Sequence, residues 1–406
     1  MANTNNNKTL NVPNLRFPEF KGEWKRSKLG QIGTGFDYGM NVAAKPYDGI
    51  HKYIRITDIE ESSSSYIDKN VVSPAGNLQD SYIVKPNDIL FVRTGASTGK
   101  TYLYDRNDGL LYFAGFLIRV NIPNDNPYFV FLQLHTQKYK KWVCIMSTRS
   151  GQPGINSQEY STYSVYLPCI KEQAKIANLL LAIDKRIATQ NKIIEKLQSL
   201  IKGINDHIQN LIDGESVCFS DLGESYSGLN GKAGNDFGSG KPFVTYMNVY
   251  QNTYVSNEEY GSVELSINER QNCVQYGDAL FTLSSETPEE VGMGAIYLGS
   301  EQELYLNSFC FGVHFNDFDH IFPPYLAYLI SSTSFRKSVY PLAQGSTRFN
   351  LQKNDFMKMR FIVPKLEIQK KIAKALDSLS NILIMEQQLY QLYTKQKQYL
   401  LQQMFI

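Results

Sequence analysis

The stretch Leu167–Ala177, LPCIKEQAKIA, recurs 196 residues later as Val363–Ala373, VPKLEIQKKIA. Each copy places a proline just ahead of a segment with helical apolar spacing, where proline suits the approach to a helix. Upstream, Val84–Phe91 (VKPNDILF) returns as Val274–Phe281 (VQYGDALF) at an offset of 190. The chain is therefore built from two copies of one unit, and DNA is the commonest linear target with a matching two-part layout.

The segments that follow the two prolines predict a pair of coiled-coil helices. In the first, apolar residues alternate by four and three positions from Ile176 to Leu211, with Gln190 as the one polar member of this heptad seam. The second segment keeps the seam less cleanly, and its Glu386 falls in the register of Gln190, so we hypothesise a polar layer that fixes register. Helices of about 40 residues rise about 60 Å. The predicted helix–helix seam comprises Ile176, Leu180, Ile183, Ile187, Gln190, Ile194, Leu197, Ile372, Leu376, Leu379, Leu383 and Glu386.

The rest of each copy is predicted to be a mixed unit of strands and short helices. Apolar residues alternate with period two in Tyr53–Ile59 and in Phe243–Val249. Late in each copy a helix opens with proline and tyrosine, from Pro127 to about Val143 and from Pro324 to about Val339. The other expected strands are Ile83–Arg93, Gly115–Val120, Leu280–Leu283 and Phe309–Phe315, and the glycine-containing turns are Ser150–Asn156 and Gln344–Asn350.

The predicted fold class is α+β, with two tandem mixed α/β domains separated by two long antiparallel helices and related by a pseudo-twofold internal repeat. The helices are expected to be antiparallel because the second globular domain lies between them in the chain, and domain termini often lie close together. The predicted boundaries are a flexible N-terminal segment at 1–20, globular domains at 21–168 and 214–364, and helical spacers at 169–213 and 365–406.

Charge and cysteine usage narrow the class of protein. The net charge is only +2, but residues 336–371 hold nine Lys/Arg and two acids, and residues 138–175 hold six and two. A basic patch that recurs in both copies suggests phosphate binding. Five scattered cysteines without a CxxC argue against a disulfide framework or a zinc site. The polar start and the absence of a membrane-length apolar run indicate a cytoplasmic protein with no membrane partner.

Two motifs that resemble catalytic signatures fail on inspection. Gly95–Thr101 (GASTGKT) has three residues between its glycines, whereas a phosphate-binding P-loop needs four. The Asn/Asp-Pro-Pro-Tyr motif of amino-methyltransferases is approached by Phe322–Tyr325 and Asn126–Phe129, but Phe322 cannot accept a hydrogen bond from an amine, and the other site has one proline. No nucleophile–base arrangement stands out, so we expect no catalytic residues, no metal site and no cofactor bound by this chain.

The repeated markers together resemble one family, the specificity subunit of type I restriction–modification enzymes. They are Leu15–Trp24 (LRFPEFKGEW), Leu29-Gly30 with Leu222-Gly223, the two Pro-x-x-x-x-Gln-x-x-Ile-Ala junctions at Pro168–Ala177 and Pro364–Ala373, and the long helices that follow. The resemblance covers essentially the whole chain. It implies that each globular domain is a target-recognition domain for one half of a bipartite, asymmetric site on double-stranded DNA.

The resemblance also implies partners and cofactors. The helices would set the gap between the half-sites and dock two modification subunits, which carry S-adenosylmethionine and methylate adenine N6. Restriction–translocase subunits would add ATP- and Mg-dependent translocation and cleavage. This chain would supply sequence choice without chemistry of its own, and it would lie in the bacterial cytoplasm, at the nucleoid when bound to DNA.

Candidate DNA contacts divide into base readout and phosphate anchoring. Arginine suits guanine, and glutamine suits adenine. The base-readout candidates, which lie in the strand-end and glycine turns, are Arg93, Ser97, Arg149, Gln152, Ser284, Thr347 and Arg348. The phosphate candidates are Lys100, Lys138, Lys140, Lys141, Lys353 and Lys358.

Two other functions remain open at this stage. The chain is alternatively a coiled-coil scaffold whose globular domains bind protein without DNA specificity, which the recurring basic segments disfavour. A stand-alone nuclease or methyltransferase is disfavoured by the broken motifs. The sequences of the half-sites, the spacer length and the state of the complex, whether active in restriction or only in modification, do not follow from the residues.

Overall fold

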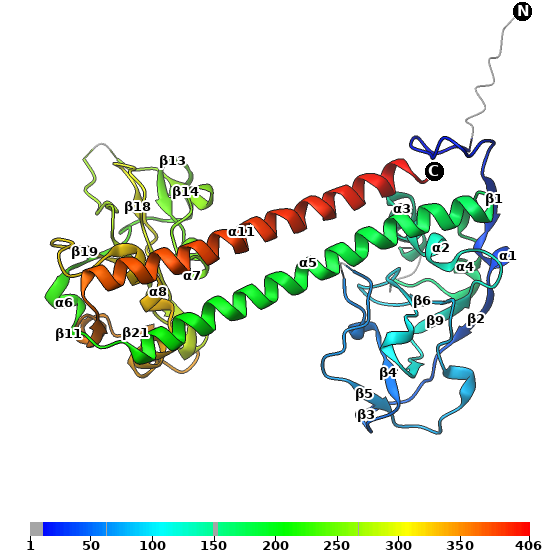
Figure 1. Ribbon diagram of the computed structural model, residues 1–406, viewed down its shortest axis with the longest axis horizontal. Coiled ribbons are helices and arrows are strands. Elements are labelled where there is room, and N and C mark those ends of the chain that lie inside the picture. The colour runs from blue at the N-terminus through cyan, green and yellow to red at the C-terminus, as the bar shows by residue number, and fades with distance from the viewer. Residues whose placement is uncertain (1–10, 62, 149–152, 267) are drawn as a thin grey trace, which may run out of the picture. The chain divides into compact units, whose positions relative to one another are not determined.

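The computed structural model describes residues 11–61, 63–148, 153–266 and 268–406. The chain divides into two compact units: unit 1 runs up to Gln190 and also contains Leu389–Ile406, and unit 2 comprises Asn191–Gln388. Two long helices, α5 (Ile170–Leu211) and α11 (Leu366–Gln403), contribute one segment to each unit (Figure 1). The predicted α+β class, with two tandem units and two long helices, is confirmed.

Unit 1 is organised around a four-stranded antiparallel sheet. Its order is β2 (Thr34–Tyr38), β9 (Leu117–Asn121), β6 (Asp88–Val92) and β7 (Thr101–Leu103). Every residue of β6 is buried, because it is central in the sheet and covered on both faces. The smaller pairs are β1 (Lys25–Lys28) with β10 (Ser164–Leu167), β3 (Ala44–Pro46) with β5 (Val72–Pro74), and β4 (Lys52–Ile54) with β8 (Leu111–Phe113).

Unit 2 repeats this plan. Its four-stranded sheet has the order β12 (Gly223–Ser227), β19 (Cys310–Phe315), β15 (Ala279–Thr282) and β17 (Gly294–Ile296), again antiparallel throughout. The repeat seen in the sequence is therefore a repeat of topology. The other pairings join β11 (Glu215–Val217) to β22 (Phe361–Val363), β13 (Phe237–Val244) to β14 (Tyr260–Val263) and β18 (Tyr305–Leu306), and β21 (Phe349–Leu351) to β16 (Ser284–Ser285) and β20 (Ala343–Gln344).

A buried glutamine explains the recurrent junction motif in unit 1. Gln173 is 1% exposed, and its Oε1 accepts from the backbone N–H of Asn126 at 2.9 Å. Its Nε2 donates to the Pro168 carbonyl at 3.0 Å and to Asp125 Oδ1 at 2.8 Å. One amide thereby joins the end of β10, the start of α5 and the start of α2 (Pro127–Gln133).

The second junction repeats the same bonds. Gln369 is fully buried, its Oε1 accepts from the Phe322 N–H at 2.8 Å, and its Nε2 donates to the carbonyls of Pro364 and His320, both at 2.8 Å. The spacing of five residues between proline and glutamine places the side chain back over the carbonyl of the proline. The motif is therefore a structural clamp between the long helix and the globular unit.

The LRFPEFKGEW segment anchors the start of α5. The Arg16 guanidinium binds both oxygens of the buried Glu172 carboxylate at 2.7 and 2.8 Å, and Trp24 Nε1 donates to the same carboxylate at 3.3 Å. Trp24 also packs edge-on against Phe405, which follows the end of α11. Residues near both ends of the chain thus share one apolar cluster in unit 1.

Polar contacts fix both long helices within each unit. In unit 1, Asp184 on α5 pairs with Lys397 Nζ at 2.6 Å, and Arg186 Nη1 donates to Tyr393 Oη at 3.3 Å, so residue numbers fall on α11 as they rise on α5. This order is antiparallel. In unit 2, Tyr328 of α8 (Pro323–Ser331) accepts from Asn205 Nδ2 through its carbonyl at 2.8 Å and donates through its hydroxyl to Asp377 at 2.7 Å.

Three predicted strands were too long. Of Ile83–Arg93, only Asp88–Val92 (β6) is a strand, and the two others give way to capped turns. Phe243–Val249 divides into the end of β13 and the helix α7 (Tyr246–Gln251), because Thr245 Oγ1 accepts from the Asn248 N–H at 3.2 Å and starts the helix. Tyr53–Ile59 likewise leaves the strand after Ile54, where Asp58 accepts from the Arg55 N–H at 2.9 Å and closes a 3-10 turn at Ile56–Asp58. In both places a side-chain cap starts a helical turn and ends the strand that the period-two pattern predicted.

The two late helices that were predicted as continuous are each broken. In unit 1, α2 ends at Gln133 and α3 (Gln137–Ser147) begins after Thr136, whose hydroxyl accepts from the Tyr139 N–H at 3.4 Å. In unit 2, α8 ends at Ser331 and α9 (Thr333–Val339) begins after Ser332, whose hydroxyl accepts from the Phe335 N–H at 3.3 Å. Hydroxyl N-caps define both breaks.

Candidate functional site

The strand-end turn and the glycine turn of unit 1 lie side by side. The segment after β6 pairs with residues before α4 (Ser157–Ser161): the Ile155 N–H donates to the Arg93 carbonyl at 2.9 Å, and the Gly95 N–H donates to the Pro153 carbonyl at 3.1 Å. The Arg93 N–H donates in turn to the carbonyl of Phe116, whose side chain is 57% exposed. Three separate stretches therefore converge at the exit of the central strand.

Unit 2 has the same convergence. The Leu351 N–H donates to the Leu283 carbonyl, and the Leu283 N–H donates to the Phe309 carbonyl, both at 2.8 Å. The side chain of Phe309 is 53% exposed, like that of Phe116 in unit 1. The two turns that the sequence singled out in each copy are thus held together by equivalent backbone bonds, and we take this convergence as the candidate site of each unit.

The described candidates of unit 1 lie in this convergence. The Arg93 guanidinium sits 4.8 Å over the Tyr38 ring, which holds it beside the strand end. Ser97 is half-buried in the turn between β6 and β7. Arg149 and Gln152 lie outside the described residues, so their roles stay predictions.

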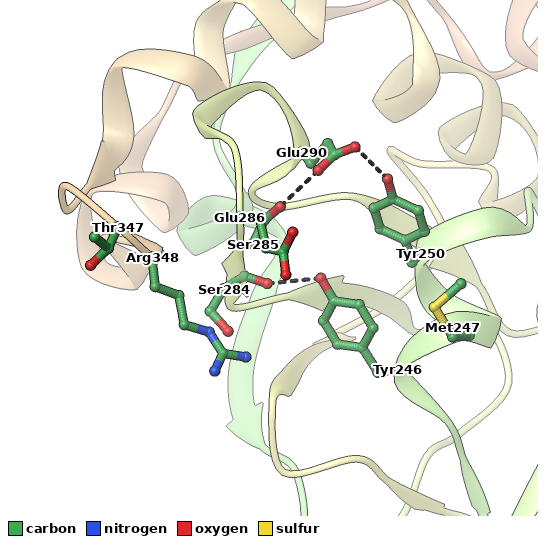
Figure 2. Close-up of a pocket in the computed structure, with 9 residues that line it drawn as sticks. All are labelled: Tyr246, Met247, Tyr250, Ser284, Ser285, Glu286, Glu290, Thr347 and Arg348. Carbon is green, nitrogen blue, oxygen red and sulfur yellow. Dashed lines mark hydrogen bonds between the residues drawn. The ribbon is translucent and has the colours of Figure 1, made fainter. Parts of the chain in front are cut away.

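In unit 2 the convergence encloses a cavity of about 410 Å³. The sequence candidates Ser284, Thr347 and Arg348 all line it, with Ser284 on β16 and the other two in the glycine turn. Figure 2 shows Arg348 extending toward Ser284, across from a helix that the sequence did not place, while the Thr347 side chain points away from that helix. The complete lining is Tyr246, Met247, Tyr250, Ser284, Ser285, Glu286, Glu290, Thr347 and Arg348.

One wall of the cavity is a pair of tyrosines on α7. Tyr246 and Tyr250 are four residues apart and stack with ring centroids 6.0 Å apart and an interplanar angle of 17°. The Tyr246 hydroxyl donates to the Ser284 carbonyl at 2.8 Å, and the Tyr250 hydroxyl donates to Glu290 Oε1 at 2.7 Å. Figure 2 shows both hydroxyls directed at the opposite wall, so the rings are fixed in place.

Glu290 is held by three hydroxyl donors. Besides Tyr250, it accepts from Ser285 Oγ at 3.1 Å and from Thr287 Oγ1 at 2.9 Å. These hydrogen bonds, with that from Tyr250 the largest cause, lower the pKa of the Glu290 carboxyl. The carboxylate therefore stays ionised and serves to hold the cavity wall together.

The lining residues that sequence reasoning missed here are Tyr246, Met247, Tyr250, Ser285, Glu286 and Glu290. The period-two pattern assigned Tyr246–Val249 to the end of a strand and left Tyr250 outside it. The Thr245 cap followed by tyrosines at i and i+4 was the signal available for a helix. No pattern in the sequence singled out Glu286.

The lysine candidates of unit 1 have different surroundings. Lys100 Nζ lies 2.5 Å from Glu61 Oε2 and donates to the Ile59 carbonyl at 3.3 Å, so its charge is already paired. Lys138 Nζ lies 4.0 Å from the centroid of the Tyr166 ring. Lys140 and Lys141 are exposed on α3. We keep Lys138, Lys140 and Lys141 as the phosphate candidates of this unit, while the Glu61 contact weakens the case for Lys100.

The lysine candidates of unit 2 begin and end α10 (Lys353–Lys358). Lys353 is half-buried, with Nζ 5.7 Å from the Phe311 ring centroid, and Lys358 is exposed. This helix follows β21, which carries the glycine turn back to the strand end. Both lysines therefore follow closely, in the sequence, the strand that belongs to the candidate site. Their role in phosphate binding stays a prediction.

All twelve predicted seam residues are buried or half-buried. The most buried are Leu180 and Leu376, both at 0% exposure, and Ile176 at 1%. Gln190 is 6% exposed and Glu386 is half-buried. The polar layer proposed for these two residues stays a prediction.

The described residues include no group of three or more His, Cys, Asp or Glu side chains placed to hold a metal ion. Their five cysteines have free thiols. Within the same residues, no helix is both long enough and apolar enough to cross a bilayer.

Comparison with known proteins points to one family. The model of the type I restriction modification DNA specificity domain matches the chain twice, over residues 21–199 and 205–393. The type I restriction enzyme MjaVIII specificity subunit of Methanocaldococcus jannaschii is 22% identical over 395 residues, which cover 91% of this chain and 88% of that protein.

Two solved structures share the fold. The S subunit of a type I restriction–modification system from M. genitalium has a TM-score of 0.59 at 12% identity, covering 97% of this chain and 99% of that one. A chain from a structure of type I R-M system assembly has a TM-score of 0.57 at 13% identity, covering 94% and 97%. At such identities these likenesses bear on the fold alone.

Proposed function

The chain belongs to the type I restriction–modification DNA specificity family, and we propose that each of its units reads one half of a bipartite, asymmetric site on double-stranded DNA. The main support for this proposal is that, in both units, the end of the central strand lies beside the glycine turn. Each of these sites contains an arginine, Arg93 in unit 1 and Arg348 in unit 2. Proteins read sequence through side chains that reach base edges, and arginine pairs bidentately with guanine.

The two half-sites are proposed to differ in sequence. The units share topology, but the positions at the strand ends have diverged: Arg93 corresponds to Leu283, and Ser97 corresponds to Thr287 at the offset of 190. Backbone bonds that any residue can make hold the turns together, so the side chains are free to vary. Because the backbone holds the turns and the side chains contact the bases, the same fold can recognise a different DNA sequence in each unit.

Phosphate anchoring is assigned to basic residues beside each convergence. We propose Lys138, Lys140 and Lys141 for unit 1, and Lys353 and Lys358 for unit 2. Such contacts position the protein without selecting sequence, and each one neutralised adds to the salt dependence of binding.

The chain is a non-catalytic specificity subunit, and the chemistry is proposed to lie in its partners. Two modification subunits would dock on the α5–α11 segments and carry S-adenosylmethionine, and restriction–translocase subunits would use ATP and Mg. The scaffold alternative without DNA specificity is not favoured, because the family model is that of a DNA specificity domain. Acting on chromosomal DNA, the complex would lie at the nucleoid.

The test is co-expression with the modification subunit from the same source, followed by mapping of N6-methyladenine across the host DNA. We expect methylation at one split, asymmetric motif, which would give both half-sites at once. A stable complex that leaves no methylated motif would contradict DNA specificity. Failure to form any complex would instead support the scaffold alternative.

A further inference from the structure

Three polar groups that line the unit 2 cavity form no hydrogen bond or ion pair with any described residue. The first is the Ser284 hydroxyl: the residue is 5% exposed, and its Oγ has no hydrogen-bond partner among the described residues. Buried hydroxyls are nearly always hydrogen-bonded, because desolvation without a partner is unfavourable. The unbonded Ser284 hydroxyl lies at the strand end where the turns converge, and a ligand would approach the protein there.

The other two groups carry opposite charges. Glu286 is exposed, and no described residue forms a hydrogen bond or ion pair with its carboxylate; the same holds for the guanidinium of Arg348, which lies 5.4 Å over the Phe309 ring. Elsewhere in unit 2, a lysine and a glutamate do form an ion pair, Lys232–Glu269 at 2.6 Å. The cavity thus presents the guanidinium of Arg348 as a donor and the carboxylate of Glu286 as an acceptor, and neither is paired with the other.

The cavity has a second carboxylate, Glu290, and only that one is hydrogen-bonded to described residues of the protein. Glu290 lines the same cavity, yet its oxygens are taken up by the hydroxyls of Tyr250, Ser285 and Thr287. It organises the wall and leaves no strong acceptor for a ligand. Glu286 is therefore the acceptor that faces the cavity, and Arg348 is the donor.

We propose that this cavity reads a G·C base pair, with Arg348 donating to guanine O6 and N7 and Glu286 accepting from cytosine N4. The assignment rests on the proposed function. It follows from the major-groove pattern, in which G offers two acceptors and C offers an amino donor, so a guanidinium and a carboxylate together match this pair. In an A·T pair the adenine amino group could still donate to the carboxylate. That pair has no base with the two adjacent acceptors, O6 and N7, that the arginine binds on guanine.

The sign of the charge strengthens the assignment. A carboxylate that faces a polyanion weakens binding to every sequence unless a base amino group donates a hydrogen bond to it. Glu286 therefore discriminates against wrong bases as well as for cytosine. The tyrosine wall and the exposed side chains of Met247 and Phe309 supply apolar surface beside these polar contacts.

The readout belongs to unit 2 alone. At the offset of 190 set by the paired strands β6 and β15, Glu286 corresponds to Ala96 and Ser285 corresponds to Gly95 in unit 1. Ala96 has no acceptor to offer an amino group. Changes at Glu286 should therefore alter one half of the methylated motif and leave the other half unchanged.

The experiment uses the complex with the modification subunit and compares the wild type with Glu286→Gln, Glu286→Ala and Arg348→Lys. Exchange of residues 219–364 identifies the half-site of unit 2. We expect that half-site to contain a G·C pair, and Glu286→Ala to admit other pairs at that position alone. Arg348→Lys should reduce methylation of the motif by roughly 5- to 150-fold. The matched control, Glu258→Gln, removes an exposed carboxylate outside the cavity and should leave the motif unchanged.

A binding measurement isolates the guanine contact. Replacing that guanine by 7-deazaguanine removes N7, so it should weaken binding of the wild-type complex but not of Arg348→Ala. The inference is overturned if the unit 2 half-site lacks a G·C pair, or if the Glu286 and Arg348 variants all methylate the wild-type motif at wild-type levels. Absence of any split motif with the wild-type chain would contradict the proposed function itself, and the inference with it.

Discussion

At the scale of single residues, neighbours decide what a side chain is for. Glu286 and Glu290 line one cavity four positions apart, but three hydroxyls engage Glu290 while no described residue engages Glu286. Lysines divide in the same way: Lys100 is paired with Glu61, whereas Lys140 is exposed. Residue type alone therefore names a candidate, and its partners show whether it is available for a ligand.

His135 provides a pH-dependent readout of the packing of unit 1. It lies between α2 and α3, with Nδ1 2.9 Å from the Phe131 carbonyl and Nε2 3.0 Å from Ser64 Oγ. Removal from solvent, the largest cause, lowers its pKa to about 4. The neutral ring satisfies both neighbours, since one nitrogen donates to the carbonyl and the other accepts from the hydroxyl.

This lowered pKa predicts a loss of stability in mild acid. Because the unfolded state takes up the proton near pH 6.5 and the folded state only near pH 4, unit 1 should lose up to about 3 kcal/mol as the pH falls across that range. Above pH 6.5 the effect is absent. His135→Gln should therefore flatten the decline of unfolding temperature between pH 6.5 and 4, whereas His207→Gln, which changes an exposed histidine, should follow the wild type. Parallel curves for the wild type and His135→Gln would contradict a neutral buried His135.

At the scale of elements, the glutamine clamps join each long helix to its globular unit. Gln173 and Gln369 each make three hydrogen bonds, and in both cases Oε1 holds the N–H at the start of a helix, of α2 or of α8. The clamp on α8 uses backbone groups alone. It therefore tolerates divergence of the side chains around it.

Removing a clamp should destabilise its own unit. Gln173→Ala and Gln369→Ala each leave buried backbone groups unpaired, so we expect a loss of about 2–4 kcal/mol in unfolding free energy. Hydrogen exchange should speed up at the Asn126 amide in the first variant and at the Phe322 amide in the second. Gln387→Ala, at an exposed position on α11, is the control and should change neither. Unchanged exchange at both amides would show that the bonds are dispensable.

At the scale of the whole molecule, chain order and structural unit do not coincide. Unit 1 is completed by Leu389–Ile406 from the far end of the chain, and Trp24 shares a cluster with Phe405 there. Unit 2 is one continuous piece, Asn191–Gln388. The segment between the two long helices can therefore be exchanged without breaking the apolar cluster that unit 1 builds from both chain ends.

Exchange of residues 219–364 for those of another family member should alter one half of the methylated motif only. The Gln369 clamp contacts this segment through the His320 carbonyl, the Phe322 N–H and the Pro364 carbonyl, groups that any donor sequence supplies. Methylation mapping of the co-expressed complex is the measurement. A hybrid with changes in both half-sites would show that the units do not read independently.

The sequence by itself determined the duplication, the two long helices and the family, because a repeat and a heptad are properties of chain order. It also identified the two turns of each copy that carry the candidate site. It missed the breaks after Gln133 and Ser331 and the helix at Tyr246–Gln251, where a single capping hydroxyl outweighs the apolar period.

Only the tertiary structure decided which side chains meet. The cavity joins α7, β16 and the glycine turn, and Ser284 and Arg348 line it together because β16 pairs with β21. Periodicity describes neighbours along the chain, whereas the availability of Glu286 and the commitment of Glu290 depend on hydroxyls that the folded backbone brings to one and not to the other.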